Sequence, residues 1–185
     1  MALSQLINEE KYGSGARSAN EMIKRLTDMD WYVNAGQQNI EAEKKMDRFM
    51  SSFNISEYDI RWISRKQLSE TIGRLSFEGS ALWETLKEVP DQLKEKIVRA
   101  GNENLLADVV DKVLEAIFHG VYKQAFYIFG DEKAVKFLVG HAMYVSVLAC
   151  AAELAEGNNA FLPVVELLEA GYLPLGPEGN TFYLL

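Results

Sequence analysis

The feature that most constrains the fold is a series of apolar pairs between Glu103 and Phe129. An adjacent apolar pair recurs every four positions over about seven helical turns, namely Leu105/Leu106, Val109/Val110, Val113/Leu114, Ile117/Phe118, Val121/Tyr122 and Ala125/Phe126. A two-residue-wide stripe at this spacing is typical of a long α-helix that packs one side on a core. The segment therefore predicts one long helix and favours a mainly helical protein.

The next apolar segment predicts the partner of this helix. Gly130 interrupts the pattern, Asp131 is a favourable N-cap, and apolar character then continues to a second glycine, Gly157. A connection as short as Gly-Asp leaves two consecutive helices antiparallel. We therefore expect a helical hairpin over residues 103–156.

Helical spacing also runs through the first half of the chain. Apolar residues three and four positions apart indicate amphipathic helices around 19–29, 46–53 and, more loosely, 60–75. The sequence SEYD at 56–59 resembles a capping box, so we expect a helix to begin there. Since 185 residues suit one domain better than two, the expected fold is all-α. It is a single domain over residues 1–185, a bundle of about eight or nine helices around the hairpin.

The end of the chain has a different composition. After a helix expected near 161–170, apolar residues flank the sequence GPEGN at 176–180, which is typical of a tight turn. We expect a short β-hairpin over 172–185 that lies on the helices. Pro174 has no N–H to donate, so its strand should lie at an edge of the sheet.

The two histidines of the chain give the most specific catalytic hypothesis. His119 and His141 each lie eleven residues from Gly130, so an antiparallel hairpin places them at the same height. Glu115, one turn before His119, completes a set that could hold a metal or exchange protons. However, His119 points away from the apolar stripe and shares a charged face with Glu115. We therefore assign no metal site, no cofactor and no catalytic residue.

His141 lies in the most apolar part of the chain. Residues 137–152 leave no polar face, which is typical of a core helix surrounded by others or of a membrane segment. This stretch is short for a membrane span and lacks aromatic or basic anchors, so we expect a core helix and no membrane contact. His141 is then a core residue with a hydrogen-bond partner. The alternative is a small enzyme or ligand-binding protein with an interior pocket near His141, lined by Tyr144, Cys150 and Tyr122.

Charge limits the class of partner. The net charge is −8, and residues 101–185 hold 11 acidic but only 4 basic side chains. Such a surface repels phosphate backbones, so nucleic acid is not an expected partner. An acidic surface can instead speed association with a basic protein.

These observations favour binding over catalysis. The N-terminal residues lack the basic and apolar regions of a secretory signal, and the single cysteine fits a reducing compartment, so we expect a cytoplasmic protein. The sequence contains no common catalytic motif. The leading hypothesis is a non-catalytic protein that binds another protein, as an adaptor, regulator or immunity protein does, with a basic partner favoured. Self-association through an exposed apolar face is compatible with either hypothesis.

Overall fold

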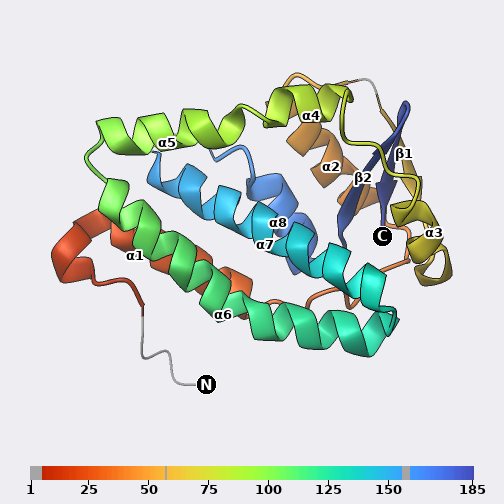
Figure 1. The fold of residues 1–185 in the computed structure, drawn as a ribbon, viewed down its shortest axis with the longest axis horizontal. Coiled ribbons are helices and arrows are strands. Elements are labelled where there is room, and N and C mark those ends of the chain that lie inside the picture. The colour runs from red at the N-terminus through yellow and green to blue at the C-terminus, as the bar shows by residue number, and fades with distance from the viewer. Residues whose placement is uncertain (1–5, 57, 156–158) are drawn as a thin grey trace.

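A computed structural model describes residues 6–56, 58–155 and 159–185, and the protein is mostly helical with a small sheet. In chain order the elements are α1 (Glu9–Thr27), α2 (Ile40–Ser52), β1 (Asp59–Trp62), the 3-10 turn η1 (Arg65–Gln67), α3 (Leu68–Ile72), α4 (Ala81–Leu86), α5 (Val89–Arg99), α6 (Glu103–Phe129), α7 (Glu132–Leu154), α8 (Leu162–Glu169), β2 (Pro174–Glu178) and β3 (Thr181–Leu184). Figure 1 shows the helices arranged around α7, with the sheet at one end. Within the described residues, 7 helices have six residues or more, so the expected number is too high. The segments α3 and η1 are only short turns of helix.

The expected helical hairpin is formed by α6 and α7. Gly130 ends α6 with a φ of 67°, a left-handed conformation that glycine adopts without steric cost. Asp131 caps α7, because its carboxylate accepts a hydrogen bond of 2.7 Å from the N–H of Ala134. The two helices then run antiparallel along each other (Figure 1). α7 ends at Leu154, and Gly157, the expected terminator, lies outside the described residues.

The remaining long helices cover the hairpin from several sides. α1 packs against both α6 and α7, and α8 lies between α7 and α2. The apolar stripes expected around 19–29 and 46–53 are confirmed as the buried sides of α1 and α2. These stripes join the buried side chains of α6, α7 and α8 in one apolar core.

The C-terminal β-hairpin is also confirmed, but it belongs to a larger sheet. β2 and β3 pair antiparallel, and β1 adds to the other side of β3 in parallel, giving the strand order β1-β3-β2. Pro174 lies in β2, which is an edge strand as expected. β3 is therefore the central strand, and it pairs with a segment that precedes it by about 120 residues.

The helix expected to begin at 56–59 is wrong, because β1 occupies this position. Asp59 donates its backbone N–H to the carbonyl of Asn180, and Ile63 donates to that of Leu184. Exposed and half-buried side chains alternate along β1, with Ile60 and Trp62 on the more covered side. This is the two-residue period of a strand, so the partner strand decides the conformation of this segment.

α7 is long and apolar enough to cross a membrane by length and composition alone. In the described chain, 61% of its most apolar window is buried inside the protein. A mostly buried apolar helix is typical of a core helix, as the sequence indicates.

Candidate functional site

A cavity of about 550 Å³ opens beside α7, which we call the α7 cavity. Its walls come from α7, α4, the beginning of α8 and the sheet, with one residue from α2. Most lining side chains are aromatic or aliphatic, and they include Phe49, Phe77, Leu82, Trp83, Leu86, Phe137, Leu148, Phe161, Val164 and Phe182. The charged residues of the lining are Lys87 and Lys136, and none of the described aspartates or glutamates contributes to it. Volume and apolar character are those of a small-molecule site.

His141 forms part of the cavity wall. Its ring is half-buried and stacks on Phe137, with ring centroids 5.9 Å apart and an interplanar angle of 20°. Burial lowers the pKa of His141 to about 4, so the imidazole is neutral near pH 7. Among the described residues it has no hydrogen-bond partner. His141 is thus not the fully enclosed and hydrogen-bonded core residue that we expected, because α7 has an open side here.

The other three residues expected near His141 lie in three different environments. Tyr144 also lines the cavity, and its side chain is partly exposed. Cys150 is fully buried in the core away from the cavity lining, and burial raises the pKa of its thiol. Tyr122 lies on α6 and is exposed, outside the cavity lining. The structure therefore brings His141 and Tyr144 together and separates Cys150 and Tyr122 from them.

Only half of the two-residue stripe on α6 is covered. One member of each apolar pair is buried, namely Leu105, Val109, Val113, Ile117, Val121 and Ala125. Towards the end of the helix the other members, Phe118, Tyr122 and Phe126, are 40%, 46% and 56% exposed. Their rings stack in sequence, with centroids 5.9 and 6.2 Å apart. We call these three residues the aromatic row.

The aromatic row lies beside the α7 cavity. The pKa of Lys136 is raised mainly by its hydrogen bond to Glu132, and Tyr122 adds a smaller electrostatic contribution. Tyr122 is therefore within electrostatic range of Lys136, which lines the cavity. Figure 1 shows α7 running between α6 on one side and α4 and α5 on the other. We call the surface formed by the aromatic row and the α7 cavity the open face of the hairpin.

Two glycines inside the hairpin helices leave space at their surfaces. A Cβ atom added at Gly120 on α6, or at Gly140 on α7, would meet no atom within 4 Å. Neither position therefore needs glycine for packing, although glycine in a helix is destabilising. Gly140 belongs to the cavity wall, between Lys136 and Tyr144 at four-residue spacing. A larger residue at this position would narrow the cavity.

The opposite cavity wall contains a close contact that requires glycine. Gly176 lies at the β-bulge of β2 with a φ of +144°. A Cβ atom there would lie 2.4 Å from Cζ of Phe77, far inside van der Waals contact. The ring of Phe77 thus packs directly on the backbone of β2, and both residues line the cavity.

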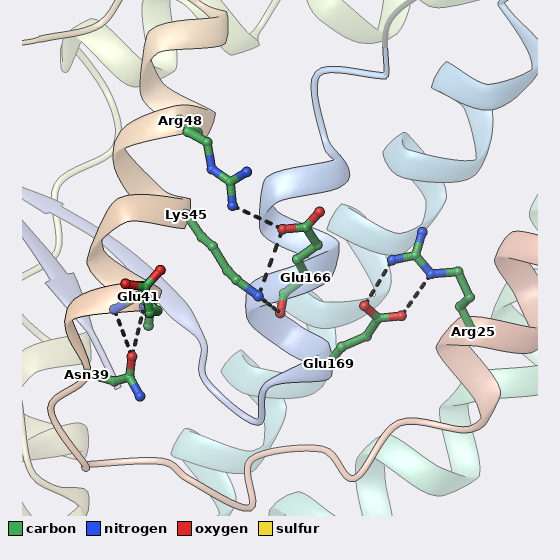
Figure 2. Close-up of polar contacts among 8 residues, drawn as sticks. Arg25, Asn39, Glu41, Lys45, Arg48, Glu166 and Glu169 are labelled. Carbon is green, nitrogen blue, oxygen red and sulfur yellow. Dashed lines mark hydrogen bonds and ion pairs between the residues drawn. The ribbon is translucent and has the colours of Figure 1, made fainter.

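The acidic surplus of the second half of the chain is partly neutralised by the first half. Figure 2 shows two carboxylates of α8 that hold α1 and α2. Arg25 donates to both oxygens of Glu169, at 2.8 and 2.9 Å. Glu166 accepts from Arg48 at 3.1 Å and lies 3.8 Å from the ammonium of Lys45. The acidic side chains of α8 therefore do not form a free acidic patch.

His119 and Glu115 lie on the exposed side of α6. The His119 ring contacts Phe118 edge-on at 5.6 Å, next to the aromatic row. In the described parts of the chain, no group of three or more His, Cys, Asp or Glu side chains is arranged to hold a metal ion.

The sequence did not indicate Lys136, Lys87 or Gly140 as site residues. The spacing of Lys136, Gly140 and Tyr144 on one line of α7 is a usable signal once this side of the helix is known to be open. No protein-family model matches this chain, and neither the curated proteins nor the solved structures include one with significant similarity to it.

Proposed function

We propose that this protein is a non-catalytic cytoplasmic protein that acts by binding another protein on the open face of the α6–α7 hairpin. The observation that supports this most directly is the exposure of the aromatic row. Three large rings stacked along one helix keep a considerable apolar area in contact with water. Contiguous apolar surface of this kind commonly marks an interaction site.

The neighbouring elements extend this surface. Trp83 on α4 and Tyr144 on α7 are 43% and 49% exposed, and both border the α7 cavity. Tyrosine and tryptophan contribute most to binding energy when a partner covers them. The α7 cavity, which Trp83 and Tyr144 border, is suited to an apolar segment of a partner protein.

The two side chains most able to take part in catalysis, those of Cys150 and His141, are poorly placed for it. The Cys150 thiol is buried and its pKa is raised by burial, which keeps it protonated and unreactive. His141 has no acidic or hydroxyl partner among the described residues that would orient it as a base. Both observations favour binding over catalysis.

The net charge of −8 favours a basic partner through long-range attraction. The ion pairs of Glu166 and Glu169 place part of the acidic charge at helix contacts. Charge therefore affects the rate of encounter, while the aromatic row supplies affinity.

The test is to recover the tagged protein gently from its source cells and to weigh it by native mass spectrometry. We expect a complex with a second, different polypeptide. The double variant Tyr122→Ser/Phe126→Ser should weaken this complex by at least about tenfold, because each exposed ring is of the hot-spot type.

Tyr127→Ser is the matched control, since Tyr127 is 88% exposed on α6 but points away from the aromatic row. This control should bind as the unmodified protein does. Recovery of the free chain alone, or a complex that tolerates the double variant, would contradict the proposal. A complex of two identical chains that the double variant dissociates would replace it with self-association.

A further inference from the structure

The α7 cavity combines three features that an apolar partner segment alone does not explain. Its interior is lined by aromatic and aliphatic side chains, its charged lining residues are lysines, and it contains a neutral imidazole without a protein hydrogen-bond partner among the described residues. Apolar pockets with a few polar groups bind small molecules and orient them through those groups.

Two lysine side chains belong to the cavity lining, and each is ion-paired with a glutamate of its own helix. Lys136 forms an ion pair of 2.7 Å with Glu132, and Lys87 forms one with Glu84. Both pairs join neighbouring turns of one helix at the surface, where such pairs contribute little to stability. Each ammonium group can therefore turn to another carboxylate at low cost.

His141 adds a hydrogen-bonding group to the same wall. The neutral ring carries one N–H, which can donate to a carboxylate oxygen or to a hydroxyl group. It stacks on Phe137, a contact that favours this orientation of the ring.

We propose that the α7 cavity binds a small amphipathic carboxylate with an apolar chain. The chain lies between α7, α4 and the sheet, and the carboxylate lies at Lys136 and Lys87. Lys87, Lys136 and His141, which carry this inference, are not part of the aromatic row, although Trp83 and Tyr144 border the cavity in both proposals.

Gly140 is consistent with this ligand. It occupies the cavity wall one turn from Lys136, and no atom lies within 4 Å of the position of a Cβ atom. The missing side chain keeps open the route between the lysine and the apolar interior.

The experiment is calorimetric titration of the purified protein with octanoate, decanoate and dodecanoate below their micelle concentrations. We expect saturable binding of one ligand per chain, with affinity rising about fourfold for each added methylene. Dodecyltrimethylammonium has the same chain with the opposite charge, and it should bind at least about tenfold more weakly than dodecanoate. Dodecan-1-ol measures the contribution of the chain alone.

Variants separate the charge from the cavity. The double variant Lys87→Gln/Lys136→Gln should bind dodecanoate at least about tenfold more weakly and should bind dodecan-1-ol with unchanged affinity. Lys123→Gln, on the exposed surface of α6, is the control and should not change either affinity. Gly140→Leu should abolish binding by filling the cavity, and Gly120→Leu is its matched control.

Three results would overturn the proposal. They are the absence of saturable binding, equal affinity for the anionic and cationic amphiphiles, and full binding by a cooperatively folded Gly140→Leu variant. The double variant of the aromatic row should still bind dodecanoate, so failure of the protein-binding proposal is distinguishable from failure of this one.

Discussion

His141 should make the stability of this protein depend on pH in a way that one substitution removes. Its pKa is lowered from the ordinary value of 6.5 to about 4 by burial, so the unfolded chain binds a proton more readily than the folded one. Stability from this residue is complete above about pH 6.5 and is lost as the pH falls towards 4. The full pKa difference corresponds to about 3 kcal/mol. Because the ring is only half-buried and borders an open cavity, we expect about 1–2 kcal/mol at pH 4.5.

The assay is urea unfolding of the unmodified protein and of His141→Leu between pH 7.5 and 4.5. Leucine fills a similar volume and cannot take up a proton, so the difference in unfolding free energy between the two proteins should change by about 1–2 kcal/mol in favour of the variant at the acidic end. Other titrating groups are common to both proteins and cancel. His119→Leu, at the exposed surface of α6, controls for removal of a histidine as such. Parallel curves for the unmodified protein and His141→Leu would refute the assignment of His141 to an apolar wall.

Three further outcomes follow from the glycines and the cysteine. Gly140→Ala and Gly120→Ala should each raise the free energy of unfolding by about 0.5–1 kcal/mol, because alanine has the higher helix propensity and the added Cβ meets no neighbour. Unchanged or lower stability in urea titrations would contradict this expectation. Gly176→Ala should lower the free energy of unfolding by about 1–3 kcal/mol, because the added Cβ clashes with the Phe77 ring. Gly179 also has a positive φ but has open space around it, so Gly179→Ala should cause a smaller loss. Equal losses in the two variants would show that the backbone angle alone matters. Cys150 should react with a thiol reagent only after denaturation, and rapid labelling of the folded chain would show that its burial is incomplete.

Local signals made the hairpins predictable. Gly130 and Asp131 are neighbours that specify the end of one helix and the start of the next. The left-handed φ of Gly130 and the hydrogen bond from the N–H of Ala134 to Asp131 confirm both assignments. The turn at 176–180 and Pro174 likewise specify an edge strand and its partner. Each of these features depends on residues close together in the chain, which is why the sequence alone was sufficient.

Features that depend on distant partners were not predictable. β1 has four residues and forms because β3, which is distant in the sequence, lies beside it. Taken alone, the apolar residues of this segment indicate a helix. The pattern of α6 shows that two residues in each turn are apolar, but not that other elements cover only one of them. Exposure of the aromatic row is a property of the whole assembly.

The candidate pocket was predictable in part. Tyr144 lies on nearly the same side of α7 as His141, because three residues advance a helix by about 300°. Cys150 is nine residues from His141, about two and a half turns, and so points to the opposite side, into the core. Helical geometry by itself therefore excludes Cys150 from a pocket that contains His141.

The parallel pairing of β1 with β3 has a consequence for the order of assembly. The helical hairpin closes through two neighbouring residues, whereas the sheet must join segments about 120 residues apart, and such distant contacts form slowly. A folding chain should therefore complete α6 and α7 before the sheet. Since β2 and β3 supply Pro174, Gly176 and Phe182 to the cavity wall, an intermediate with a complete hairpin would still lack the cavity. We therefore expect the cavity to form after the helical hairpin, when the strands pack against α7.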